Sequence, residues 1–171
     1  IIVGMLYSCL LAVACIKFKA DQTLVGTALN LLATSVALIF TKRLTGGAST
    51  TINYDKSAFV YIFGNFNFNI FLFLGIIILV ASIIVLYKLK FGLRLRACGE
   101  NPSAADSVGI NVNAYRYVGV LISGALGGLG ALAYIIPTSS YWNSTVGVAG
   151  FGFLALAVMI FGQWKPLRIF I

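Results

Sequence analysis

The sequence has little charge and no histidine. Charged residues make up 9% of its 171 residues, compared with about 25% in ordinary soluble domains, and only 4 of them are Asp or Glu. The three cysteines, Cys9, Cys15 and Cys98, show no metal-ligand spacing. No apolar run carries an acid–base pair, and no Gly-x-x-x-x-Gly-Lys-Ser/Thr phosphate loop occurs. These absences argue against an enzyme and predict neither a metal site nor a cofactor held by this chain.

Apolar residues dominate what is present. They form 60% of the chain, and the mean hydropathy is +1.01. A membrane-spanning helix needs about 20 mostly apolar residues, and the apolar stretches are 1–16, 23–40, 69–87, 117–136 and 147–162. None of them alternates with a period of two residues, so helices are expected. The predicted fold class is all-α, a polytopic transmembrane helix bundle with about five spanning helices in contact with membrane lipid.

The basic residues indicate how this bundle is oriented. The net charge is +8, and alternating helices would place the loops 17–22, 88–116 and 163–171 on one side. That side carries Lys17, Lys19, Lys88, Lys90, Arg94, Arg96, Arg116, Lys165 and Arg168, and the other side carries Lys42, Arg43 and Lys56. Because cytoplasmic loops are enriched in Lys and Arg, we expect these three loops in the cytoplasm and the chain in the cytoplasmic membrane. Orientation accounts for the positive charge, so no nucleic-acid partner is expected.

The loop 41–68 is then extracytoplasmic. Its second part, 61–69, is rich in aromatic residues and asparagine, and aromatic side chains favour the membrane interface. We expect a short interfacial helix there, which anchors the chain or docks a partner. Tyr141 and Trp142, in the next outer loop, are predicted to anchor the chain in the same way.

A polar segment between two long apolar stretches carries helix start and stop signals. Asn101 is a favoured N-cap, Pro102 suits the first helical position, and Gly109 suits the left-handed conformation that ends a helix. The predicted helix, 103–108, is too short to be stable alone, so packing must hold it. It is either a plain connector or a surface presented to a soluble partner.

Four polar residues within apolar stretches are candidates for a substrate path. Thr27, Asn30 and Thr34 share one helix face because they lie three and four residues apart, and Ser123 is a candidate of the same kind. A buried amide in lipid costs several kcal/mol unless it finds partners, so Asn30 is expected to face the protein interior. The alternative is hydrogen bonding between helices.

Two pairs of small residues, each four apart, predict close helix packing: Gly124 with Gly128, and Gly127 with Ala131. Small residues at this interval let helix backbones approach closely in a membrane. The same smooth face would also permit helices to slide between inward-open and outward-open forms.

The segment 93–112, with Arg116 and 123–130 after it, resembles the permease subunits of bacterial ABC transporters, in the group of simple-sugar and nucleoside importers. Segments 18–33 and 150–167 are similar to that family in the same order, the first to nucleoside-type permeases in particular. Typical members are nearly twice as long. Residues 1–171 are therefore expected to form one permease domain that is incomplete at both ends.

The resemblance implies that the short helix is a coupling helix that docks on a separate ATPase subunit. Carried over by position, the contact residues would be Gly99, Glu100, Asn101, Pro102, Ala104, Ala105 and Gly109. The ATPase would bind ATP and Mg. The implied partners are this ATPase, a second permease subunit, and an extracytoplasmic substrate-binding lipoprotein.

Nucleoside import is the favoured function, and import of a simple sugar is the alternative. A secondary transporter or channel is less consistent with the sequence, because the acidic residues Asp21, Asp55, Glu100 and Asp106 all lie outside the apolar stretches, whereas ion coupling usually needs ionisable residues within the membrane. A membrane enzyme remains as a third reading.

Overall fold

The computed structural model describes the backbone of residues 1–47, 51–53, 60–63, 66–138, 141–143 and 151–170, and the side chains of 1–47, 73–137 and 152–169. The helices are α1 (Ile2–Ala12), a π-helical turn (Val13–Lys17), α2 (Gln22–Leu44), α3 (Ile70–Tyr87), α4 (Lys90–Glu100), α5 (Pro102–Ser107), α6 (Val112–Thr138), α7 (Phe151–Phe161) and α8 (Pro166–Phe170). The short strands are β1 (Thr51–Asn53), β2 (Val60–Phe63), β3 (Phe66–Asn69) and β4 (Tyr141–Asn143).

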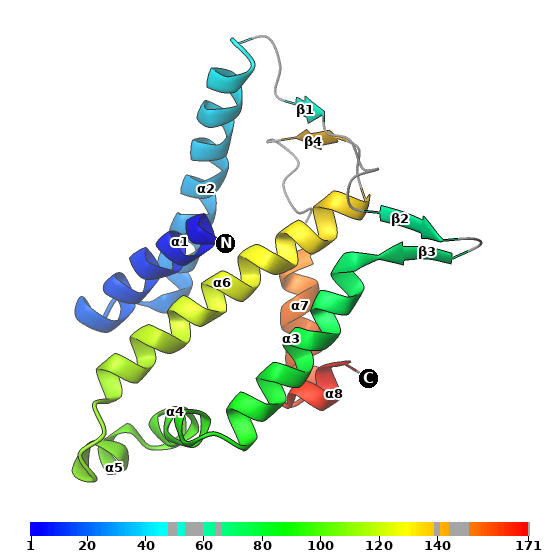
Figure 1. Cartoon of the computed structure of the whole chain (residues 1–171). Coiled ribbons are helices and arrows are strands. Elements are labelled where there is room, and N and C mark those ends of the chain that lie inside the picture. Colours follow the sequence, from blue (N-terminus) through cyan, green and yellow to red (C-terminus); the bar gives the residue numbers. More distant parts are fainter. Residues whose placement is uncertain (48–50, 54–59, 64–65, 139–140, 144–150, 171) are drawn as a thin grey trace.

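Helix α6 forms the axis of the molecule. Its 27 residues correspond to about 40 Å at 1.5 Å per residue. Helices α4 and α5 lie at its N-terminal end, whereas the strands lie at its C-terminal end, toward which α2 also runs (Figure 1). The segment predicted to be cytoplasmic and the loop predicted to be external are therefore at opposite ends of one long apolar helix.

Helix α1 makes its most extensive contacts with α6, through small residues on both helices. A Cβ atom added to Gly4 would lie 2.6 Å from the carbonyl oxygen of Gly124 and 3.4 Å from Gly128 Cα. A Cβ atom on Gly124 would meet the Ser8 side chain, and Ala12 is only 1% exposed. The stripe Gly4, Ser8 and Ala12 has four-residue spacing, so it offers α6 the close approach that such spacing favours.

Gly127 lies outside this contact, because a Cβ atom there would meet nothing within 4 Å. Ala131 is half-buried. The two pairs of small residues on α6 are thus not equivalent in this structure, and only the pair Gly124 and Gly128 faces α1.

Two helices are long and apolar enough to cross a membrane by themselves, Gln22–Leu44 and Val112–Pro137. A third span is possible if Phe73–Tyr87 and Lys90–Glu100, which are bent by 71° at their junction, count as one. The remaining apolar helices are shorter: α7 has 11 residues, or about 16 Å, against a hydrocarbon core of about 30 Å. Residues 147–150 of the fifth predicted stretch lie outside the described residues, and the prediction of five spans is not confirmed.

The two loops predicted to be external contain paired strands, whereas the sequence predicted an interfacial helix over 61–69. Strands β2 and β3 pair antiparallel with Tyr61 opposite Phe68, and β1 pairs with β4 with Ile52 opposite Trp142. The prediction was wrong because Phe and Asn alternate over Phe66–Asn69 with the two-residue period of a strand. The fold is therefore helical with short β pairs, and the anchoring role of Tyr141 and Trp142 stays a prediction.

Candidate functional site

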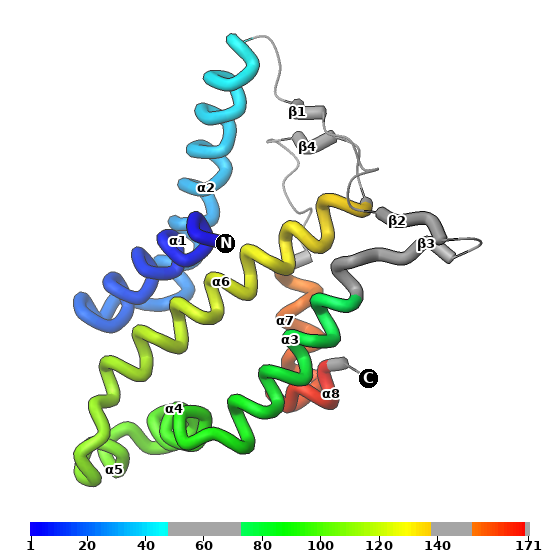
Figure 2. Tube along the Cα trace, in the orientation of Figure 1, coloured from blue at the N-terminus to red at the C-terminus, as the bar shows by residue number. Residues whose placement is uncertain are grey.

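The best-defined site lies at the end of the molecule where α4, α5 and α6 meet (Figures 1 and 2). Helix α5 begins as the sequence predicts. Asn101 has an extended backbone, and its Oδ1 atom accepts hydrogen bonds from Ala104 N (3.2 Å) and Ser103 Oγ (2.7 Å). Pro102 occupies the first helical position, where a missing N–H costs nothing.

Helix α5 ends with a Schellman motif. Gly109 has φ +81°, the left-handed conformation that glycine adopts without strain. Gly109 N donates to Asp106 O (2.9 Å), and Ile110 N donates to Ala105 O (3.1 Å). These two bonds satisfy carbonyl groups that a helix end leaves without partners. The predicted short helix is confirmed, with caps at both ends that fix where its six residues begin and end.

The two alanines of α5 differ in burial. Ala104 is exposed, whereas Ala105 is 5% exposed and packs inside the chain. Of the other residues carried over from the family, Gly99, Glu100, Asn101 and Gly109 are exposed and Pro102 is half-buried. Ala105 therefore supports α5 from within and does not belong to its free surface. Val108, the C-cap of α5, was not among the predicted contact residues. It is 79% exposed and adds an apolar side chain to the free surface of α5.

Helix α4 was predicted as part of a loop, and the structure shows a packed amphipathic helix. Its buried residues are Gly92 and Cys98. A Cβ atom on Gly92 would lie 2.5 Å from Leu86 Cα and 2.7 Å from Leu86 O at the end of α3, so the sharp bend between α3 and α4 needs glycine at this position. Leu95 on α4 reaches α6, since its Cδ1 atom lies 3.3 Å from where a Gly119 Cβ would be. A signal existed in the sequence: Phe91, Leu95 and Cys98 have helical spacing.

Aromatic residues position two arginines of α4. Arg94 Nη1 donates to the hydroxyl oxygen of Tyr115 on α6 (3.2 Å), and this bond raises the pKa of the Arg94 guanidinium above its ordinary value. The Arg96 guanidinium carbon lies 4.8 Å from the centre of the Tyr87 ring, a cation–π distance. The Phe91 and Tyr115 rings are 5.5 Å apart. These contacts tie α4 to α3 and α6.

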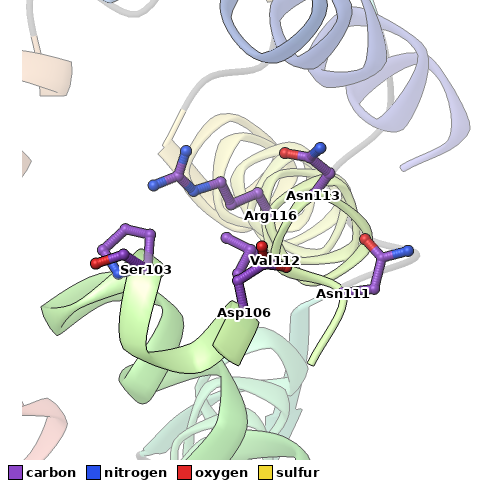
Figure 3. Close-up of a pocket in the computed structure, with 7 residues that line it drawn as sticks. Ser103, Asp106, Asn111, Val112, Asn113 and Arg116 are labelled. Atoms are coloured by element: carbon purple, nitrogen blue, oxygen red, sulfur yellow. The ribbon is translucent and has the colours of Figure 1, made fainter. Parts of the chain in front are cut away.

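A shallow polar hollow lies between α5 and the start of α6 (Figure 3). Pro102, Ser103 and Asp106 line it from α5, and Asn111, Val112, Asn113 and Arg116 line it from the start of α6. Asn111 caps α6 by accepting a hydrogen bond from Ala114 N (3.1 Å). In Figure 3 the Arg116 side chain extends toward Ser103. Asp106 forms no ion pair with Arg116 within the described part of the chain, so both charges are free to meet a partner.

The candidate substrate-path residues lie outside this site, on α2 and α6. Thr27 and Thr34 donate to Leu24 O (2.9 Å) and Leu31 O (2.8 Å) of their own helix. Asn30 is exposed and has no hydrogen-bond partner among the described side chains and backbone. Asn30 therefore does not face the interior of the described part of the chain, and its place in the substrate path stays a prediction. The reason is that the described part of the chain places no helix against that face of α2. Ser123 on α6 is also exposed.

Among the residues the structure describes, no group of three or more His, Cys, Asp or Glu side chains lies close enough to hold a metal ion. The site at α4, α5 and α6 offers hydrogen-bond donors, arginine cations and small side chains. Such a surface suits binding of another macromolecule.

Comparison with known proteins places these features in a family. The chain is 39% identical over 176 residues to the nucleoside ABC transporter permease protein NupC of Lactococcus lactis subsp. cremoris, a match that covers 97% of this chain and 55% of that protein. It is 38% identical over 176 residues to the guanosine ABC transporter permease protein NupQ of Bacillus subtilis, covering 96% of this chain and 54% of that protein.

A third relative is the putative glucose ABC transporter permease protein TsgC13 of Haloferax volcanii, which is 28% identical over 177 residues, covering 98% of this chain and 54% of that protein. The chain thus spans about half the length of the curated relatives it matches. No solved structure matches it.

All of residues 1–171 match one family, described as the permease component of the branched-chain amino acid transport system. The apolar helices agree with a membrane protein of this kind. This chain belongs to the family of branched-chain amino acid transport system permease components.

Proposed function

We propose that the protein is the membrane-spanning subunit of an ABC importer in the cytoplasmic membrane, and that it carries nucleosides. The similarity to the nucleoside permease of L. lactis and the guanosine permease of B. subtilis supports the substrate class. A separate ATPase binds ATP and Mg, so this chain performs transport without chemistry of its own. A second permease subunit and an extracytoplasmic substrate-binding lipoprotein complete the transporter. The loops 17–22, 88–116 and 163–171 face the cytoplasm.

Helix α5 is the coupling helix in this proposal, and its doubly capped geometry is the observation that carries the assignment. A six-residue helix has little stability of its own, yet α5 is fixed by Asn101 at its start and by Gly109 at its end. A short helix that is rigid can transmit a movement of the ATPase to the membrane helices without unfolding. Its neighbours α4 and α6 connect it directly to α3 and to the long axis of the molecule.

The contact surface for the ATPase consists of the exposed side of α5 and the hollow beside it. Ala104 permits close approach, Val108 offers an apolar contact, and Arg116 and Asp106 offer opposite charges. Gly99, Glu100, Asn101, Pro102 and Gly109 shape and border this surface. Ala105 is buried and packs α5 against the rest of its own chain.

The substrate path includes the polar face of α2. The hydroxyl groups of Thr27 and Thr34 donate hydrogen bonds to carbonyl groups of α2 itself. The Asn30 amide is therefore the polar group on this face that can bind a substrate. An amide both donates and accepts hydrogen bonds, which suits the polar edge of a nucleobase or a ribose hydroxyl. Ser123 on α6 is a further member of the path.

Import of a simple sugar is the second candidate, and the similarity to the putative glucose permease of H. volcanii favours it. The identity is lower, 28% against 39%. Sugar hydroxyl groups would use the same Asn30 amide, so the α2 face does not separate the two substrates.

Uptake by cells tests both parts of the proposal. Cells that lack their own transporter would express the intact permease with its ATPase, second permease and binding lipoprotein, and would be supplied with labelled nucleosides or labelled sugars. We expect nucleoside uptake, reduced more than about tenfold by Ala104→Arg, which corresponds to at least about 1.4 kcal/mol of lost coupling contact. Ala104→Ser is the matched control and should transport normally.

The substrate class and the coupling role of α5 can be contradicted independently. Uptake of sugar without nucleoside would contradict the substrate class and leave the coupling helix intact. Normal nucleoside uptake by the Ala104→Arg variant, at equal protein in the membrane, would contradict the coupling role.

A further inference from the structure

Helix α4 exposes a face that combines leucines with cations. Leu89 at its start and Leu93 one turn later are 50% and 63% exposed. Spacing of 100° per residue places Arg96 on one side of these leucines, and Lys90 and Arg94 on the other side. All three cations are exposed, and the acidic residue Glu100 lies only at the far end of the same face.

The orientation of α4 suits a membrane surface. Phe73–Tyr87 of α3 is mostly apolar and carries no charged residue, and α4 follows it after a bend of 71°. If α3 runs along the membrane normal, α4 lies close to the plane where the headgroups begin. The buried residues Gly92 and Cys98 hold α4 against the rest of the chain. An amphipathic helix in this plane places apolar side chains below the headgroups and cations among them.

The two arginines are oriented without being neutralised. Tyr115 accepts one hydrogen bond from Arg94, and the Tyr87 ring lies beneath Arg96. Neither partner is a carboxylate, and no carboxylate that the structure describes forms an ion pair with either arginine. A guanidinium has five N–H donors, so several remain free on each. Arginine binds phosphate in a bidentate, charge-assisted manner.

We propose that α4 is an interfacial helix that binds the phosphate headgroup of an anionic phospholipid through Arg94, Arg96 and Lys90. Exposed leucines between the cations favour a lipid over free phosphate, because acyl chains provide the apolar contact that Leu89 and Leu93 require. Clusters of basic residues next to a membrane span act in this way. The inference does not depend on the substrate or on the coupling role of α5.

The test is lipid retention by the intact transporter. The complete complex would be purified from vesicles of phosphatidylcholine mixed with phosphatidylglycerol, and the phospholipid that stays bound would be measured by mass spectrometry. We expect selective retention of phosphatidylglycerol, and a fall of roughly tenfold or more in the double variant R94Q/R96Q, since each cation near a membrane surface contributes to anionic lipid binding. The double variant K42Q/R43Q, which removes two charges at the end of α2, is the matched control and should retain the lipid.

Two further arms identify the ligand and guard against misfolding. The R94K/R96K variant keeps both charges and should recover most of the retention, and Leu93→Ser should weaken it. Inorganic phosphate added as competitor should not displace the lipid. Equal retention in wild type and R94Q/R96Q would overturn the proposal, and so would displacement by inorganic phosphate. Loss of the ATPase from R94Q/R96Q with unchanged lipid retention would assign this face to a protein partner instead, which also overturns it.

Discussion

At the residue scale, Asn101 joins two helices. It is the C-cap of α4, where its backbone N–H donates to Ala97 O (3.0 Å). It is also the N-cap of α5, where its side chain accepts a hydrogen bond from Ala104 N. Glu100 precedes it and lies at the negative end of the α4 dipole and near the positive end of the α5 dipole. One residue thus sets the angle between the amphipathic helix and the short helix.

Replacing Asn101 tests this role. Asn101→Ala removes the cap acceptor and should cost α5 about 1 kcal/mol of stability, seen as faster hydrogen exchange at the amides of Ala104 and Ala105. Asn101→Asp keeps an acceptor oxygen and is the matched control. Exchange at the same rate in Asn101→Ala and wild type would contradict the capping role.

Asp21 caps α2 and makes its start sensitive to pH. Its carboxylate accepts hydrogen bonds from Thr23 N (2.7 Å) and Leu24 N (3.3 Å), and these bonds lower the pKa of the Asp21 carboxyl below its ordinary value of 3.8. A group whose pKa is lowered on folding stabilises the folded form above its unfolded pKa, and this contribution is lost as pH falls through the folded pKa.

We therefore expect Asp21 to titrate below its ordinary value in carboxyl carbon NMR, and the first turn of α2 to loosen only at acid pH. Asp21→Asn still accepts the two hydrogen bonds and should remove the pH dependence without removing the cap. An ordinary titration midpoint for Asp21 would contradict this account.

At the element scale, the contact between α1 and α6 makes glycine necessary at one position of α6 and replaceable at another. Alanine is favoured over glycine inside a helix by about 1 kcal/mol. Gly127→Ala meets nothing within 4 Å and should be neutral or stabilising. Gly124→Ala places its Cβ 2.7 Å from the carbonyl oxygen of Gly4, a backbone atom that cannot rotate away. Overpacking of this kind costs about 1–3 kcal/mol.

The measurement is thermal unfolding of the intact protein in one detergent. Gly124→Ala should lower the midpoint and Gly127→Ala should not. Equal midpoints for the two variants would mean that α1 does not pack on Gly124.

The bend between α3 and α4 allows a similar comparison. Gly92→Ala would push against the backbone of Leu86, whereas Gly99→Ala meets nothing within 4 Å on the same helix. We expect Gly92→Ala alone to disturb α4, with loss of protection of the α4 amides in hydrogen exchange. Protection of α4 that is equal in the two variants would contradict the tight bend.

The sequence predicted those elements that depend on local chemistry. Asn101, Pro102 and Gly109 each carry a cap or turn preference that acts within a few residues, and α5 begins and ends where these preferences place it. The long apolar runs of α2 and α6 were equally clear. Helix α4 was predicted as part of a loop because four cations lie between Lys88 and Arg96, although Phe91, Leu95 and Cys98 share one helix face.

Features that depend on distant contacts were not predictable in this way. The small-residue stripe Gly4, Ser8 and Ala12 has meaning only once α6 lies against it. Ala104 and Ala105 look alike in sequence, and only the packing of α5 distinguishes the exposed residue from the buried one. The strand pair over 60–69 is different, because it is local and its signal, the alternation of Phe and Asn over Phe66–Asn69, is present in the sequence.

At the scale of the whole molecule, the two ends of α6 differ in charge and in secondary structure. Helix α6 separates an end that bears α4, with its two arginines, and α5 from an end that bears paired strands (Figure 1). In the proposed importer the first end faces the cytoplasm, as the positive-inside rule predicts. Lys42 and Arg43 in the last turn of α2 lie toward the other end, where they also complement the helix dipole. The account requires that a cytoplasmic ATPase meets only the α5 end.

Site-specific photocrosslinking in the intact transporter tests this requirement most directly. A photoreactive amino acid would replace either Ala104 on α5 or Arg43 at the end of α2, and crosslinked partners would be identified after illumination. We expect position 104 to capture the ATPase subunit and position 43 to capture none of it. Capture of the ATPase from position 43, or its absence from position 104 in a complex that still hydrolyses ATP and imports substrate, would contradict the account.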